Sequence, residues 1–305
     1  MRVTHQMMTS NFKLHINRQA GEMLIQQKRI ASGKRVNKPS DDPDAMARIL
    51  EHRSRLERID QYDHHIKRGK TRIEFTEQVL EQVSDLVNRA RQIAEDKKGS
   101  NVTADDRLSA AAEVKDIYDQ VMQLANTRYE NNYIFGGHQT DAPPFEKNPP
   151  ATYDIQYNGD AGDYRMIIGE YTEVSLDSDG SLFFHDQANG GINIFDELRD
   201  LITGLENPVL SAGSAQIDAT IDPLFDGREQ VNLKRAELGP KIYQLDVSQQ
   251  HWNNFKPKIE NAMAEEENAD ITEAVLVLQS LEIAYESTLA TAARMIEPGL
   301  MKYLN

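Results

Sequence analysis

The sequence predicts a mainly α-helical fold: a long coiled-coil helical bundle formed by both chain ends, with a small β-rich insert domain in the middle. No proline occurs between Asp44 and Ala142, which leaves room for long helices. Four prolines follow within residues 143–150, and eight of the 17 glycines lie between Gly136 and Gly191. Apolar residues spaced by three and four recur before and after this region, so helical flanks surround a middle of different character.

The first helix is expected over residues 12–30. Phe12, Ile16, Met23 and Ile30 lie on a thin apolar stripe, and Gly33 is a plausible helix end. Asp42 and Pro43 then form an N-cap and first-turn pair that predicts the start of the next helix.

A long coiled-coil helix is expected to follow. Residues 59–94 alternate apolar or small positions at steps of three and four over five heptads, and Lys97-Lys98-Gly99 supplies a C-terminal stop. The segment 103–106 is a second start signal, for a helix whose apolar face is predicted to continue to Tyr129.

The insert shows strand-like alternation. Residues 153–157 and 164–168 flank Asn158-Gly159-Asp160, which predicts that these two strands pair in a hairpin. A short helix is expected over 195–202, and helix resumes near Ala215, where Pro240 and Pro257 are expected to kink or interrupt it. A final striped helix is expected over 271–296, ending near Pro298.

Composition excludes several classes of protein. The longest aliphatic run, residues 274–278, is far short of the roughly 18 residues of a spanning helix, so no membrane insertion is expected. The start of the chain has no secretory signal segment, and the absence of cysteine excludes disulfides and thiolate sites. A net charge of −15 argues against nucleic acid as a partner.

No catalytic or phosphate-binding motif is present, so the sequence predicts no enzyme, no cofactor and no metal. His64-His65 is the nearest to a ligand pair. Adjacent helical residues point about 100° apart, and two surface histidines are the better interpretation.

The two chain ends carry opposite charge. Residues 1–40 hold eight Lys and Arg against one Glu, a net +7, whereas residues 265–305 hold eight acids against two bases, a net −6. Such ends are suited to lie side by side. Their stripes bury little area, so we expect them to order on assembly. The predicted assembly interface on the two terminal helices comprises Phe12, Ile16, Met23, Ile30, Leu278, Leu281, Tyr285, Leu289, Ala292 and Ile296.

Several motifs resemble the bacterial flagellin family and, within it, the proteins of the hook-filament junction. The segment 29–43 is similar to the family's N-terminal signature, residues 133–137 with Thr140 and Pro144-Phe145 resemble the junction branch, and residues 278–289 resemble its C-terminal helix. The Pro240 position departs from the family's unbroken helix. The motif residues are Gly33, Asn37, Pro39, Ser40, Asp41, Asp42, Pro43, Tyr133, Phe135, Gly136 and Gly137.

The resemblance implies a structural subunit in three layers. Residues 1–42 with 265–305 would form terminal core helices, 43–135 with 215–264 an inner helical rod, and 136–214 an outer β-rich insert. Residues 88–94 resemble a flagellin segment that packs between subunits, which implies that Arg89, Arg91 and Ile93 also belong to the assembly interface. The resemblance further implies export through the flagellar type III apparatus without a cleaved signal peptide, and an extracellular place in the flagellum. The implied partners are hook-associated protein 1, flagellin, other copies in a ring, and an export chaperone on the C-terminal helix.

Three alternatives come from other classes. A filament-forming flagellin is the nearest, and it is favoured if the protein polymerises alone. An enzyme housed in the insert is disfavoured because fewer than 80 residues hold no clustered triad or ligand set. A coiled-coil adaptor does not explain residues 133–137.

Overall fold

The computed structural model describes residues 5–99, 101–148, 153–176, 179–185 and 190–301, without the side chains of residues 5, 6, 8, 9 and 294–301. It has two compact units, one of Met1–Ile59 and Asn253–Asn305, the other of Asp60–Trp252. The helices are α1 (His5–Ser32), α2 (Pro43–Lys97), α3 (Ala104–Ala125), α4 (Ser181–Phe184), α5 (Ile194–Glu206), α6 (Leu210–Glu267) and α7 (Ile271–Met301). The predicted helical bundle with a small insert is confirmed.

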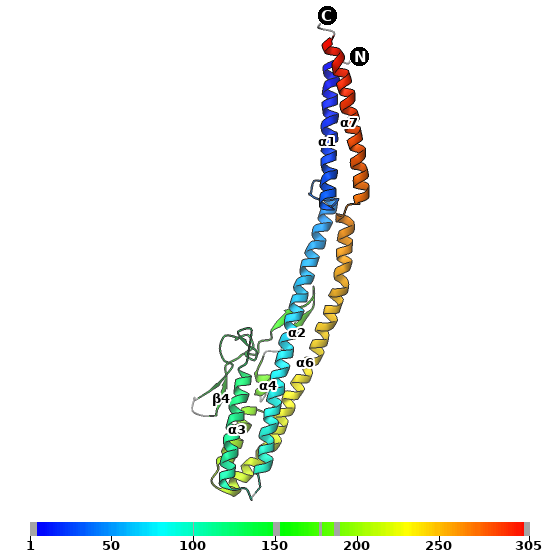
Figure 1. Cartoon of the computed structure of the whole chain (residues 1–305). Helices are drawn as coiled ribbons and strands as arrows, with labels where there is room; N and C mark the ends of the chain where they lie inside the picture. The colour runs from blue at the N-terminus through cyan, green and yellow to red at the C-terminus, as the bar shows by residue number, and fades with distance from the viewer. Residues whose placement is uncertain (1–4, 100, 149–152, 177–178, 186–189, 302–305) are drawn as a thin grey trace. The chain divides into compact units, whose positions relative to one another are not determined.

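The first unit is built from α1, α7 and the adjoining parts of α2 and α6. Helices α1 and α7 run side by side (Figure 1). Gly33 has φ +70°, a conformation that favours glycine, and its N–H donates to the Arg29 carbonyl at 2.9 Å to end α1. The expected cap is confirmed, because the Asp42 carboxylate accepts from the Ala45 N–H at 3.0 Å.

The core of the second unit follows the long stripe of α2. Ile66, Ile73, Leu80, Val83 and Val87 are buried, and they pack in one cluster with residues of α3, α5 and α6. Helix α6 supplies its own buried series to this cluster, Ile217, Leu224, Val231, Leu238 and Leu245. The stripe expected from three-and-four spacing is therefore the main core of this unit.

Helix α6 continues through Pro240 and Pro257, which corrects the expected break. Each proline removes one backbone donor from the helix, at a cost of about 3 kcal/mol in a regular interior. Leu238 and Leu245, on either side of Pro240, are fully buried against the rest of the core. This packing offsets the lost hydrogen bond and keeps the helix in place.

The described residues in the middle of the chain contain three two-stranded antiparallel sheets, two of them within the expected insert. They pair β1 (Arg128–Tyr129) with β2 (Asn132–Tyr133), β3 (Phe145–Lys147) with β4 (Ile155–Tyr157), and β5 (Arg165–Ile167) with β6 (Glu173–Ser175). The predicted hairpin across residues 158–160 is wrong, because β4 pairs backwards with β3 and β5 pairs forwards with β6. Asp160 explains the change: its carboxylate accepts from the N–H groups of His138 at 2.7 Å and Gly162 at 2.9 Å, so this segment serves as an anchor.

The helical stripe that was expected to reach Tyr129 is shorter than predicted. Helix α3 begins as predicted, with the Thr103 hydroxyl accepting from the Asp106 N–H, and it ends at Ala125. The Asn126 side chain then binds the backbone of Phe145 in both directions, at 2.8 and 3.0 Å. Tyr129 accordingly lies in β1, next to a turn in which Glu130 and Asn131 both have positive φ.

Candidate assembly surface

The facing sides of α1 and α7 are only half covered. Among the described side chains of α1 none is fully buried, and in α7 only Ala274 is. Of the predicted interface residues, Leu289 remains 43% exposed and Ile296 lies outside the described side chains. The others in these two helices are partly buried: Phe12, Ile16, Met23, Ile30, Leu278, Leu281, Tyr285 and Ala292.

A second set of apolar side chains points away from this pair. Leu14 is 66% exposed and Ile283 is 69% exposed, and both lie between other exposed apolar residues of their own helix. Sequence reasoning missed this outer set, although its members recur at helical spacing, because it followed only one stripe per helix. The remaining members are Met7, Leu24, Ile25, Ile271, Val275, Leu276 and Val277.

Ion pairs join the N-terminal part of the chain to the end of α6. Glu267 is 6% exposed and lies 2.6 Å from both the Lys34 ammonium and the Arg53 guanidinium. Glu266 receives two hydrogen bonds from Arg48, at 2.9 and 3.0 Å. Along the described side chains no ion pair joins α1 to α7. The opposite charges are instead paired between residues 34–53 and the end of α6.

Arg35 links the N-terminal signature, residues 29–43, to Glu266 and Glu267 at the end of α6. Its guanidinium donates to Asp42 at 3.0 Å and to the Glu266 carbonyl at 2.9 Å, and its backbone N–H donates to the Glu267 carbonyl at 2.7 Å. Asp41 accepts from the N–H groups of Asn37 and Lys38, which closes the turn before α2. Residues 33–43, which include Pro39, Ser40 and Pro43, therefore form the connection between α1 and α2.

These contacts lower the pKa of all three carboxyl groups. The Ala45 N–H, together with Arg35, holds the pKa of Asp42 below its usual value. The hydrogen bond from Arg48 does the same for Glu266. Burial acts to raise the pKa of Glu267, but the hydrogen bond from Lys34 and the charge of Arg53 outweigh it and lower the pKa.

The α2 residues expected at an assembly interface make contacts within the chain. Arg89 pairs with Glu113 of α3 at 2.7 Å, and Arg91 pairs with Glu95 at 2.6 Å. Ile93 is 4% exposed and belongs to the core, so the structure corrects its expected place. The resemblance of residues 88–94 to a flagellin segment does not distinguish a buried side chain from one at an interface.

The Tyr133–Gly137 motif is packed mainly against residues of the insert. Phe135 packs edge-on against Phe183 and Phe184, with ring centroids 5.4 and 5.2 Å apart. Gly137 has φ +67°, and a Cβ there would lie 2.1 Å from an Asp160 oxygen. Gly136 is equally tight, because a Cβ would lie 2.2 Å from the Gln139 carbonyl. Tyr133 stacks under the Arg128 guanidinium at 4.3 Å.

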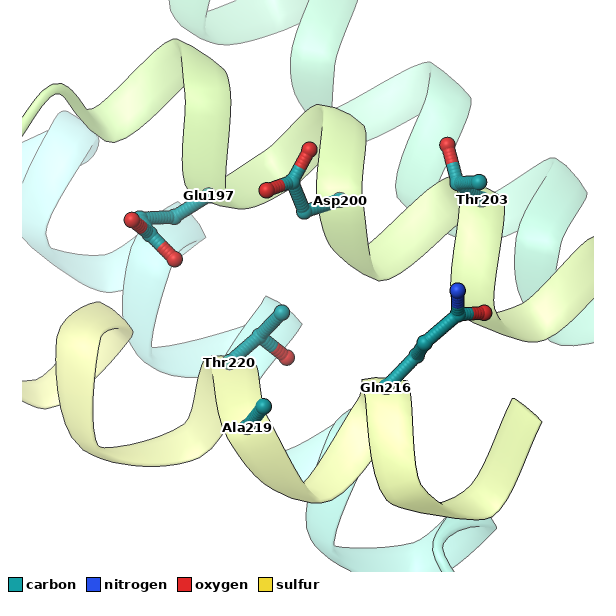
Figure 2. A pocket seen from close by; sticks show the side chains of 6 residues that line it. All are labelled: Glu197, Asp200, Thr203, Gln216, Ala219 and Thr220. Atoms are coloured by element: carbon teal, nitrogen blue, oxygen red, sulfur yellow. The ribbon is translucent and has the colours of Figure 1, made fainter. Parts of the chain in front are cut away.

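A cavity of about 290 Å³ lies between α5 and α6 (Figure 2). It is lined by Glu197, Asp200, Thr203, Gln216, Ala219 and Thr220. Burial, followed by the nearby charges of Asp200 and Asp196, raises the pKa of Glu197 to about 6. The described residues contain no group of three or more His, Asp or Glu side chains placed to hold a metal ion. Nor does any helix in the described ranges have the length and apolar character to cross a membrane.

Taken together, paired terminal helices with uncovered apolar faces and a long helical body define a helical subunit of an assembly. The model of the bacterial flagellin N-terminal helical region matches residues 3–140. Flagellar hook-associated protein 3 of Escherichia coli (strain K12) is 28% identical over 81% of this chain and 81% of its own length. Flagellin FlaB1 of Treponema pallidum is 20% identical over 87% of each chain.

The fold is also that of a solved flagellar protein. The crystal structure of hook-associated protein 3 from Legionella pneumophila matches with a TM-score of 0.64 and 13% identity, over 71% of this chain and 98% of that one. The chain is therefore similar to the structural flagellar proteins of the flagellin family, in its N-terminal helical region and in its fold. Its identity to hook-associated protein 3 is higher than its identity to flagellin FlaB1, as its motifs predicted.

Proposed function

We propose that the chain is a structural subunit of the junction between the flagellar hook and the flagellin filament. The observation that carries the proposal is the pair α1 and α7, whose outer faces leave apolar side chains such as Leu14 and Ile283 in contact with solvent. Exposed apolar side chains that recur along one helix are typical of a surface that another protein covers. The similarity to hook-associated protein 3 supports a place at the junction.

The proposed mechanism is mechanical. The outer faces of α1 and α7 pack against those of neighbouring copies, which form a ring, and each turn of contact removes apolar surface from water at about 25 cal/mol per Å². Hook-associated protein 1 lies on the hook side of the ring and flagellin on the filament side. Residues 1–42 with 265–305 form the terminal layer, 43–135 with 215–264 the inner rod, and 136–214 the outer insert.

Export precedes assembly in this proposal. The chain passes unfolded through the flagellar type III apparatus without a cleaved signal peptide, while a cytoplasmic chaperone covers the apolar C-terminal helix. The exposed residues of α7, including Leu276 and Ile283, support a need for such cover. The terminal helices order as the ring forms.

A deletion strain complemented with the full chain or with a chain lacking residues 290–305 tests the function. The full chain is expected to restore motility and filaments, and the truncated chain to leave unpolymerised flagellin in the medium. Filament growth on the truncated chain contradicts the proposed role of the C-terminal helix. Long filaments formed by the purified protein alone would favour the second candidate, a filament-forming flagellin, which the similarity to FlaB1 keeps in view.

A further inference from the structure

Arg72 is a buried arginine on α2 that forms no ion pair with any acidic side chain among the described residues. Its side chain is 8% exposed, and its guanidinium carbon lies 4.8 Å from the ring centroid of Tyr164. Among the described residues, no carboxylate or carbonyl oxygen accepts a hydrogen bond from this guanidinium. Burial lowers the pKa of Arg72 below its usual value, and the nearby Tyr164, Tyr129 and Glu130 do not compensate.

A second buried arginine, Arg107, provides a comparison, because its guanidinium has hydrogen-bond acceptors within the chain. Arg107 is 1% exposed, and its guanidinium donates to the carbonyls of Leu210 and Gly99 and to the Ser214 hydroxyl. A buried guanidinium is stable only when its N–H groups find acceptors, and a cation–π contact engages the face of the group and not these N–H groups. The stacking on Tyr164 therefore leaves the N–H donors along the edge of the Arg72 guanidinium without an acceptor among the described residues.

The surroundings of Arg72 are positive and reachable. Arg68 lies one helical turn earlier and binds Glu130, in the β1–β2 turn, at 2.7 Å. One carboxylate thus faces two guanidinium groups. Arg107 has a fully enclosed, unpaired Nε atom, but no nitrogen of Arg72 is among such enclosed atoms, so the edge of its guanidinium reaches solvent.

We propose that Arg72 is the cationic wall of an anion-binding site where α2, the β1–β2 hairpin and β5 meet, and that the site takes a carboxylate or phosphate group. The planar guanidinium offers two parallel N–H donors to an oxygen pair, and the Tyr164 ring fixes its plane. The anion is either dissolved or an acidic side chain of a second copy. This inference stands apart from the proposed function, since every residue it uses belongs to the second unit.

Arginine Nε–H signals of the ¹⁵N-labelled full chain test the site directly. Sodium acetate or sodium phosphate is titrated against sodium chloride at constant ionic strength. The Arg72 signal is expected to shift and saturate with a midpoint of about 1–10 mM, the affinity that two charge-assisted hydrogen bonds supply. The exposed Arg58, which donates only to Ser54, is the internal control and is expected not to saturate.

A dilution series separates the two sources of the anion. If a second copy supplies the carboxylate, the Arg72 signal shifts with protein concentration, without added anion, in step with dimer formation by sedimentation. If the source is a dissolved anion, the chemical shift of the Arg72 signal does not change with protein concentration and changes only with the concentration of acetate or phosphate. A signal that responds to neither, or that responds to chloride as strongly as to phosphate, overturns the proposal.

Arg72→Met gives an independent readout. In chloride its thermal midpoint is expected to equal or exceed that of the unmodified chain, because an unpaired buried charge is gone. The rise in midpoint that phosphate gives the unmodified chain is expected to disappear, whereas Arg58→Met keeps it. Phosphate stabilising Arg72→Met as much as the unmodified chain contradicts the site. The titration decides on its own if this variant does not fold.

Discussion

The ammonium of Lys34, just past the end of α1, lies 2.6 Å from a buried carboxylate oxygen of Glu267, the last residue of α6. The same oxygen receives a hydrogen bond from Arg53. Two segments from opposite ends of the chain are thus joined through one carboxylate. The stability of the first unit should therefore depend on the charge of this carboxylate.

Glu267→Gln is expected to lower the stability of the first unit by about 1.5–3 kcal/mol, the contribution of hydrogen bonds to a charged group. The amide keeps the volume of the side chain but loses the charge that two cations share. Hydrogen exchange at residues 33–53 measures the effect. Glu51→Gln, which removes an exposed pair with Arg55, is the matched control and is expected to change stability by less than about 0.5 kcal/mol. Equal effects of the two substitutions would contradict the role of burial.

Acid is expected to weaken the ion pairs and hydrogen bonds of Asp42, Glu266 and Glu267. The pKa values of Asp42, Glu266 and Glu267 are all lowered in the folded chain, so the unfolded chain binds protons first as pH falls. The stabilisation is fully present above the ordinary carboxyl pKa of about 4.5 and is lost as pH falls below it through the folded values. Hydrogen exchange at residues 33–53 between pH 6 and pH 3 follows the loss. Protection that is constant over this interval would refute the coupling.

Glu197 is expected to show the opposite pH dependence. Its pKa of about 6 lies above the unfolded value of 4.5, so the unfolded chain releases its proton first and stability falls as pH rises from about 4.5 through 6. A shift of this size corresponds to about 2 kcal/mol, which partial exposure reduces to about 1 kcal/mol. Glu197→Gln is therefore expected to gain about 1 kcal/mol over the unmodified chain at pH 7.5 and nothing at pH 4. Urea unfolding at both pH values measures the difference.

A matched control separates the cavity carboxylate from surface charge in general. Glu237 is exposed and pairs with Lys234, so Glu237→Gln should leave the pH dependence of urea unfolding unchanged. A gain for Glu197→Gln that is the same at both pH values would mean that the amide improves packing and that titration is not the cause.

Two glycines are expected to respond to alanine with opposite sign. Gly137→Ala places a Cβ 2.1 Å from Asp160 at φ +67°, so the anchor must move, and a loss of at least about 2 kcal/mol is expected. Gly21 lies inside α1, and an added Cβ would meet nothing within 4 Å beyond its chain neighbours and its own helix backbone, so Gly21→Ala is expected to gain about 0.5–1 kcal/mol. Thermal unfolding of both variants checks the pair, and a destabilised Gly21→Ala is the result that would count against it.

Local patterns predicted the helices well, because their signals lie within a few residues. The α2 stripe, the Asp42 cap and the Thr103 start needed only spacing and capping chemistry. Strand pairing was predicted wrongly because it depends on contacts distant in sequence. The Tyr157 hydroxyl donates to the Phe135 carbonyl at 3.1 Å, and Asp160 holds His138, so β4 is placed by residues more than 20 positions earlier.

The same limit applies to the candidate surface. Charge at the two ends predicted that they attract, but the partners of Glu266 and Glu267 are Arg48, Lys34 and Arg53, which no local pattern singles out. Ile93 was assigned to an interface because residues 88–94 resemble a flagellin segment, and only its burial shows that it lies in the core. That no described residue accepts a hydrogen bond from Arg72 likewise emerges only when its surroundings are known.

The outer faces of the terminal helices are expected to matter for assembly and not for the fold of the single chain. Leu14→Gln and Ile283→Gln change side chains that are 66% and 69% exposed, so the thermal midpoint should move by no more than the shift that about 0.5 kcal/mol produces. Incorporation into flagella should fall sharply, because each substitution puts an amide into a contact that is apolar in the assembled ring. Asn11→Gln, a polar exchange at an exposed position of α1, is the control and should leave both properties unchanged. Motility restored in the deletion strain by the double variant Leu14→Gln, Ile283→Gln would show that these faces are not the assembly surface.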